Sequence, residues 1–143
     1  MVKDTRIQLL SFTGSSQVGA WVAETVARRM GKYLLECSGN NAIIVAPDAD
    51  LNLAIPAIVF GAAGTAGQRC TTTRRLFVHK STSKAVTDAL ISAYHSIAIG
   101  DPNDSSNLMG PLIDQTAVTQ FKQAISEAQT AGGTILYLSL IHI

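Results

Sequence analysis

A cysteine that directly follows an arginine in a glycine-rich segment is the first candidate for chemistry in this sequence. Cys70 stands in the run Gly67-Gln68-Arg69-Cys70-Thr71. A neighbouring cation and nearby backbone N–H groups favour the thiolate, which is the nucleophilic form of a cysteine. The alternative is that Cys70 is a small buried core residue, which is the commoner role of a lone cysteine.

A glutamate at the end of an apolar segment is the second candidate. Glu36 follows Tyr33-Leu34-Leu35 and precedes Cys37-Ser38-Gly39. Burial at the end of a strand would suit this carboxylate to act as a general base. The alternative, that Glu36 simply points into water, is equally open from the residues alone.

A glycine-containing turn before a helix is the third candidate. The sequence there is Phe12-Thr13-Gly14-Ser15-Ser16-Gln17-Val18-Gly19. A helix N-terminus binds phosphate through its free N–H groups and its partial positive charge. Gly14 would let a pyrophosphate approach the backbone, and Gly19 would let the helix pack closely. By itself the pattern is weak, and an ordinary capped turn is the more frequent explanation.

The histidines argue against a cysteine hydrolase and against a metal site. We expect His79 at the end of a strand and His95 in a helix. Neither position suggests an imidazole within hydrogen-bond reach of Cys70, which a Cys–His hydrolase needs. No pair of Cys and His residues has the spacing of metal ligands, so no metal is expected.

The composition limits the class of protein. The 143 residues are 47% hydrophobic and 15% charged, with a net charge of +1. This balance excludes intrinsic disorder and a charged tail, so no nucleic-acid partner is expected. Since soluble domains carry about 25% charged residues, the shortage of charge predicts that a further surface packs against this one.

One uncharged segment raises the question of a membrane. Residues 51–68 approach the length of about 20 residues that a spanning helix needs. Pro56 and the glycines at 61, 64 and 67 interrupt the segment, so it predicts a buried helix followed by a loop. Two cysteines do not form a disulfide framework, and residues 1–10 do not resemble a signal peptide. We therefore expect a cytoplasmic location and no membrane partner.

Strands and helices alternate along the chain, which favours an α/β fold. Strands are expected at about 7–12, 33–35, 42–45, 76–78 and 134–137. Helices are expected at about 16–30, 51–63, 83–97 and 114–130. The unbroken apolar run at 42–45 predicts a strand that is covered on both faces.

Taken together, these segments resemble the aldehyde dehydrogenase superfamily. FTGSSQVG, LLECSGNN and GTAGQRC stand in the order of that family, and SGNNAIIV, GTAGQRCTTTRRLFVH, GDPND and MGPLID resemble its antiquitin branch. The resemblance extends from about residue 7 to 137. It implies a fragment of the aldehyde dehydrogenase fold, with residues 1–38 ending a Rossmann-like NAD-binding domain and 39–137 beginning the α/β catalytic domain. Residues 138–143, LSLIHI, resemble a sequencing adapter and are expected to be a non-native tail.

The resemblance implies a role for each candidate residue. The thiolate of Cys70 would form a thiohemiacetal with the aldehyde, and then a thioester after hydride transfer to NAD. The backbone N–H of Cys70 would form half of the oxyanion hole. Glu36 would activate the water that hydrolyses the thioester. The cofactor-binding residues would be Gly14, Ser15, Ser16, Gly19 and Cys37. The substrate-binding residues would be Arg69 and Thr71, and the substrate L-2-aminoadipate 6-semialdehyde.

Departures from the family pattern leave alternatives open. The family often has Leu-Gly-Gly where this chain has Cys37-Ser38-Gly39. The family's oxyanion-hole asparagine and its ribose-binding lysine and glutamate have no counterpart here, so we expect a longer parent enzyme. The resemblance also implies that this parent is a homotetramer. The chain by itself could be an inactive fragment that at most binds nucleotide weakly. A dehydrogenase that transfers the acyl group to coenzyme A is a further alternative, which Glu36 disfavours.

Overall fold

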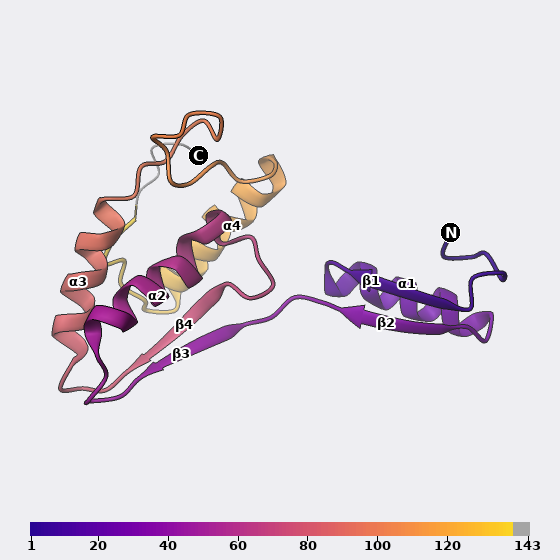
Figure 1. Cartoon of the computed structure of the whole chain (residues 1–143), viewed down its shortest axis with the longest axis horizontal. Coiled ribbons are helices and arrows are strands. Elements are labelled where there is room, and N and C mark those ends of the chain that lie inside the picture. Colours follow the sequence, from indigo (N-terminus) through magenta and orange to yellow (C-terminus); the bar gives the residue numbers. More distant parts are fainter. Residues whose placement is uncertain (139–143) are drawn as a thin grey trace. The chain divides into compact units, whose positions relative to one another are not determined.

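The computed structural model describes residues 1–138 and divides the chain into two compact units. The first unit comprises Met1–Asn40, and the second begins at Asn41. Figure 1 shows both units, which are described separately below. The tail expected at 138–143 lies outside the described residues except for Leu138.

The first unit is a strand, a helix and a second strand. Its elements are β1 (Leu9–Thr13), α1 (Ser16–Arg28) and β2 (Lys32–Glu36), and the two strands pair in parallel. Helix α1 begins where the sequence predicts, because the hydroxyl of Ser15 accepts a hydrogen bond from the N–H of Val18 at 3.2 Å. The core of the first unit is formed by Leu10, Val22 and Val26.

Within residues 41–138, the second unit also has two parallel strands, together with three α-helices. Its elements are β3 (Asn41–Val45), α2 (Leu51–Ala63), the single turn η1 (Gly64–Gly67), β4 (Thr73–Val78), α3 (Ser83–His95) and α4 (Gln115–Thr130). Asp50 caps α2 by accepting from the N–H of Asn52, and Asp114 caps α4 by accepting from that of Ala117. Val45, Ile58 and Val86 form the core between β3, α2 and α3.

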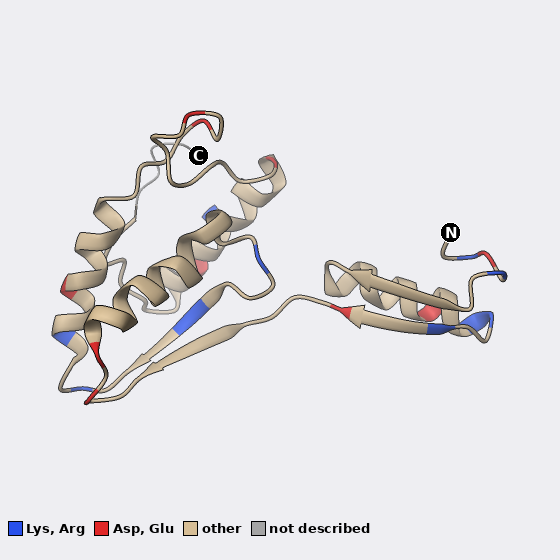
Figure 2. Ribbon diagram, viewed as in Figure 1, with Lys and Arg blue, Asp and Glu red and all other residues tan. Residues whose placement is uncertain are grey.

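Two expectations about burial are wrong for the described chain. Figure 2 shows that β3 and α2 carry no charge, and these apolar segments were expected to be covered. Yet Ile44 in β3 is 80% exposed, and Leu53 and Phe60 in α2 are 74% and 70% exposed. Each element packs one face on the core of the second unit and leaves its other apolar face uncovered by residues 1–138.

The strand expected at 134–137 is also wrong. This segment pairs with no strand among residues 1–138. It is held by a side chain instead, because the ring of Tyr137 stacks on Tyr94 of α3, with 6.2 Å between their centroids. The Tyr137 hydroxyl also donates to the carbonyl of Tyr94 at 3.4 Å.

Candidate functional site

The carboxyl ends of β1 and β2 bring together the candidates of the first unit. Thr13 and Glu36 are partners in the parallel ladder, and the N–H of Gly14 donates to the carbonyl of Glu36 at 3.1 Å. Ligands of α/β sheets bind outside the carboxyl ends of parallel strands. The Glu36 side chain at this edge is exposed in the described chain, not buried.

A close approach between α1 and the segment after β2 depends on Gly19. A Cβ atom at this position would lie 2.7 Å from Sγ of Cys37. The absence of a side chain at Gly19 therefore lets the first turn of α1 pack directly on Cys37. The glycine turn, the start of α1, Glu36 and Cys37 thus form one edge of the first unit.

The start of α1 at this edge presents backbone amides without partners among residues 1–138. The hydroxyl of Ser15 satisfies one of the N–H groups at the start of α1. The amides of Ser16 and Gln17 form no hydrogen bond with any of residues 1–138. Free amides and the helix dipole make such a terminus a binding site for anions.

The backbone before Cys70 adopts an unusual conformation. Thr65, Ala66 and Gly67 have φ values of 56°, 52° and 70°, so three consecutive residues lie in the left-handed region. Only glycine adopts this region freely, and each other residue pays about 1–2 kcal/mol. Such conformations persist where surrounding contacts hold them.

Side chains hold this loop on both sides of Cys70. The amide Nδ2 of Asn41 donates to the carbonyls of Cys70 and Thr72, at 2.6 and 3.3 Å. The buried Thr72 hydroxyl accepts from the N–H of Arg69 at 3.1 Å. Before Cys70, Gln68 connects the loop to residues 111–113. Sequence reasoning assigned no role to Asn41, Gln68 and Thr72, although all three lie within motifs that it had singled out.

The nucleophile candidate itself remains accessible. Cys70 is exposed and makes no disulfide. Its backbone N–H forms no hydrogen bond with any of residues 1–138, although its carbonyl is bound by Asn41. The loop therefore offers a thiol, which can act as a nucleophile, together with a free backbone N–H of the kind that stabilises an oxyanion. The neighbouring Thr71 is exposed as well.

The guanidinium group of Arg69 folds back over the end of α2. Its Nη2 donates to the carbonyl of Phe60 at 2.7 Å, and its central carbon lies 4.7 Å from the centroid of the Phe60 ring. Its Nε is buried without a partner among residues 1–138. Arg69 also lines a cavity of about 580 Å³ whose other walls are mainly apolar residues of α2 and of segments near α3.

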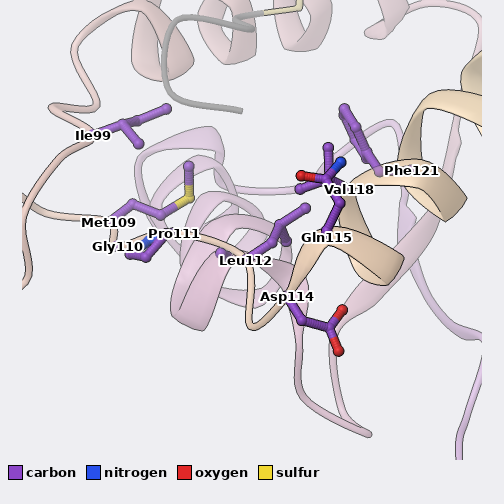
Figure 3. Close-up of a pocket in the computed structure, with 10 residues that line it drawn as sticks. Ile99, Met109, Gly110, Pro111, Leu112, Asp114, Gln115, Val118 and Phe121 are labelled. Atoms are coloured by element: carbon purple, nitrogen blue, oxygen red, sulfur yellow. The ribbon is translucent and has the colours of Figure 1, made fainter.

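A second cavity, of about 390 Å³, lies beside α4. Figure 3 shows Ile99 and Met109 on one side of it, and Val118 and Phe121 of α4 on the other. Its one ionisable side chain is that of Asp114, which caps α4. This apolar cavity therefore contains none of the candidate catalytic groups.

The structure groups the predicted site residues into two sets. Gly14, Ser15, Ser16, Gly19, Glu36 and Cys37 belong to the first unit, and Arg69, Cys70 and Thr71 belong to the second. Among the described residues, no three His, Cys, Asp or Glu side chains are arranged to hold a metal ion. Nor is any helix within residues 1–138 long and apolar enough to cross a membrane.

Comparison with known proteins assigns the chain to a family. Residues 1–140 match the model of the aldehyde dehydrogenase family. The chain is 55% identical over 137 residues to alpha-aminoadipic semialdehyde dehydrogenase of Mus musculus, covering 96% of this chain and 25% of that protein. It is 54% identical over 136 residues to aldehyde dehydrogenase family 7 member A1 of Pisum sativum, covering 95% and 27%. The chain thus spans about a quarter of the length of these relatives.

Solved structures agree with this result. The crystal structure of betaine aldehyde dehydrogenase from Staphylococcus aureus in complex with NAD+ superposes with a TM-score of 0.90 at 30% identity, covering 94% of this chain and 27% of that one. The NAD+ complex of an aldehyde dehydrogenase from Bacillus cereus superposes with a TM-score of 0.91 at 28% identity, covering 95% and 28%. The α/β units described above therefore correspond to part of the aldehyde dehydrogenase fold, and the chain belongs to the aldehyde dehydrogenase family.

Proposed function

We propose that this chain is part of an NAD-dependent aldehyde dehydrogenase in which Cys70 is the nucleophile and Glu36 the general base. The observation that carries the proposal is the state of Cys70, whose thiol is exposed and whose backbone N–H is free of partners among residues 1–138. A nucleophile and an oxyanion donor are thus presented by one loop. Identity of 55% to an aldehyde dehydrogenase supports the assignment.

The proposed reaction has two stages. In the first, the thiolate of Cys70 adds to the aldehyde carbon, and the carbonyl oxygen becomes an oxyanion that accepts a hydrogen bond from the Cys70 N–H. Loss of the aldehyde hydrogen as a hydride, for which NAD would supply the acceptor when bound, converts this adduct into a thioester on Cys70. In the second stage, Glu36 removes a proton from water, and the water oxygen attacks the thioester carbon. The C–S bond then breaks, which releases the carboxylate and restores the Cys70 thiolate.

We further propose that residues 1–38 belong to the NAD-binding domain and residues 39–137 to the catalytic domain. The start of the second compact unit at Asn41 supports this division. In the first unit, the turn at Gly14, Ser15 and Ser16 would hold the cofactor's pyrophosphate at the free amides of α1. Gly19 and Cys37 would maintain the close packing beneath this turn.

The proposed substrate is L-2-aminoadipate 6-semialdehyde. It is supported by the similarity to the mouse enzyme named after alpha-aminoadipic semialdehyde. In the second unit, Arg69 lines a cavity next to the loop that carries Cys70, and its charge suits the carboxylate of such a substrate. Thr71 would contribute to the same pocket. We also propose a cytoplasmic homotetramer that needs no nucleic-acid or membrane partner.

A chimera tests this function. The matched 137 residues of the mouse alpha-aminoadipic semialdehyde dehydrogenase are replaced by those of this chain, and NADH formation with the semialdehyde is measured by absorbance. We expect activity in the chimera and its loss in the Cys70→Ala variant, since no other group on the loop can form the thioester. Retained NADH formation in that variant, or an inactive chimera that is folded and tetrameric, contradicts the proposal.

The alternative function concerns the 143 residues alone. The family's oxyanion-hole asparagine and ribose-binding residues have no counterpart in this sequence, so the isolated chain is expected to bind nucleotide weakly and to form no NADH. Calorimetric titration with NAD measures nucleotide binding by the isolated chain, and an absorbance assay for NADH measures its turnover. Turnover by the isolated chain would contradict this alternative.

A further inference from the structure

The side-chain amide of Gln68 joins two segments that lie far apart in the sequence. Its Oε1 accepts a hydrogen bond from the N–H of Ile113 at 2.9 Å. Its Nε2 donates to the carbonyl of Thr65 at 3.3 Å and reaches that of Pro111 at 3.5 Å. One amide therefore contacts both the turn that precedes Cys70 and residues 111–113. We call these contacts the Gln68 bridge.

The Gln68 bridge acts on backbone that would not keep its conformation unaided. Thr65 and Ala66 both have positive φ values, which are unfavourable for residues with a side chain. The backbone N–H of Gln68 also donates to the carbonyl of Thr65, at 3.0 Å. Backbone and side chain of Gln68 thus bind the same carbonyl and close the strained turn two residues before Cys70.

The other end of the bridge is itself anchored. Residues 109–113 begin at Met109, which pairs with Ile99 in an isolated parallel β-pair. There the N–H of Gly100 donates to the carbonyl of Met109 at 3.0 Å. They lead into Asp114, whose side chain caps α4. Gln68 therefore fastens the nucleophile loop to a segment that is held at both of its ends.

We infer that Gln68 is a positioning residue for Cys70, acting by fastening the strained turn 65–67 to residues 111–113. Gln68 does not touch the reacting atoms in this role. It fixes the backbone from which the thiol and the free N–H of Cys70 project. The inference rests on the proposed function, because it assumes that Cys70 is the nucleophile.

Hydrogen exchange and thiol labelling of the 143-residue chain test the inference without requiring turnover. In Gln68→Leu, which removes donor and acceptor, we expect exchange of the Ile113 and Gln68 amides to become at least threefold faster. We expect the rate of Cys70 alkylation by iodoacetamide to change at least threefold, as read on the tryptic peptide Cys70–Arg74. Alkylation of Cys37 in the first unit should stay constant.

Two further variants make the test specific. Gln68→Glu retains an acceptor for the N–H of Ile113 but loses the donor to Thr65 and Pro111, so it should preserve the Ile113 amide's protection while altering Cys70 labelling. Gln123→Leu removes an exposed glutamine of α4 whose side chain bonds, among residues 1–138, only to Glu127, and it should change neither readout.

Specific outcomes overturn the inference. Unchanged labelling of Cys70 in Gln68→Leu does so, whatever happens at Ile113. A general rise of exchange through β3, β4 and α3 does so as well, because Gln68 would then support the whole unit rather than the loop. An inactive chimera in the preceding experiment would contradict the proposed function instead, so the two failures are distinguishable.

Discussion

The side chain of Asn41 binds the main chain of Cys70, with 2.6 Å between Nδ2 and the carbonyl oxygen. Asn41 is the first residue of β3, and Cys70 lies in the loop that leads into β4. The same Nδ2 reaches the carbonyl of Thr72 at 3.3 Å. Asn41 at the start of β3 thus holds the loop that precedes β4. It binds this loop at Cys70 and after it, whereas Gln68 fastens the loop before Cys70.

Asn41→Asp is expected to loosen this attachment. The substitution keeps the shape of the side chain but places carboxylate oxygens against two carbonyl oxygens, where no donor remains. A typical hydrogen bond contributes about 0.5–1.5 kcal/mol net to stability, and the bond to Cys70 is exposed while that to Thr72 is partly buried. We expect faster hydrogen exchange at residues 70–73 and a lower free energy of unfolding for the second unit. Asn52→Asp, on the exposed first turn of α2, introduces the same charge where the helix dipole favours a carboxylate. It should therefore neither speed exchange at residues 70–73 nor lower the free energy of unfolding; equal effects would show that charge alone is responsible.

Gly19→Ala is expected to separate α1 from Cys37. The new Cβ would lie 2.7 Å from Sγ, and overpacking of this kind costs about 1–3 kcal/mol. Alanine stabilises a helix relative to glycine by about 1 kcal/mol. The free energy of unfolding of the first unit should therefore fall by less than the packing cost alone. The first unit can be followed by the fluorescence of Trp21, the single tryptophan of the chain.

Removing the sulfur provides the control for this prediction. When Gly19→Ala is combined with Cys37→Ala, the new Cβ meets no Sγ. The substitution at Gly19 should then no longer destabilise the first unit, and the helix preference of alanine should raise its stability. We expect a coupling free energy of about 1 kcal/mol or more between the two substitutions. Strict additivity would show that the packing of Gly19 on Cys37 does not limit this position.

Acidic pH is expected to destabilise the loop that carries Asp101 and Asp104 and leads into residues 109–113. The N–H and side-chain amide of Asn103 hold the pKa of Asp101 below its usual 3.8, and the N–H and hydroxyl of Ser106 lower that of Asp104. A lowered folded-state pKa gives stability that is present above pH 3.8 and is lost as the pH falls through the folded-state values. Carboxyl carbon NMR between pH 6 and 2 should show both residues titrating below the usual pKa.

Substitution of Asn103 checks the cause of the lowered pKa of Asp101. Asn103→Ala removes the side-chain donor but keeps the backbone N–H, so the pKa of Asp101 should rise partway towards 3.8. The pKa of Asp104 should stay unchanged, because its partners lie in Ser106. A shift of both residues together would mean that the loop responds as a whole and not through individual bonds.

Local signals in the sequence predict the helix starts correctly. Ser15, Asp50 and Asp114 each cap a helix through a bond to a residue two or three positions later, so a short window contains the whole interaction. The α/β class and the family also follow from such segments, and both are confirmed.

Interactions between distant segments could not be predicted in this way. The bonds from Asn41 to Cys70 and from Ile113 to Gln68 join residues 29 and 45 positions apart, and no local pattern indicates them. Within residues 1–138, the expectation that β3 is covered on both faces is not met, for a related reason. Apolar composition shows that a face can be buried, but not which segment covers it, and Ile44 meets no such cover among residues 1–138.

Glu36→Gln is expected to separate the two stages of the proposed reaction. If Glu36 serves only to activate water, the glutamine variant of the chimera still forms the thioester and releases one NADH for each Cys70. Slow hydrolysis should then limit later turnovers, giving a rapid burst followed by a rate at least tenfold below that of the unmodified chimera. General bases of this kind contribute about 10²–10⁴-fold to a rate, so the expected decrease lies within their range.

Stopped-flow absorbance measures this burst, and mass spectrometry of the peptide Cys70–Arg74 detects the acyl group on the thiol. Cys70→Ala should show neither burst nor adduct, because it lacks the sulfur that carries the acyl group. Asp88→Asn, a change of an exposed carboxylate that pairs with Lys84 on α3, should retain normal kinetics. Loss of the burst in Glu36→Gln would instead assign this carboxylate to the first stage, where it would take the proton from the Cys70 thiol before attack on the aldehyde.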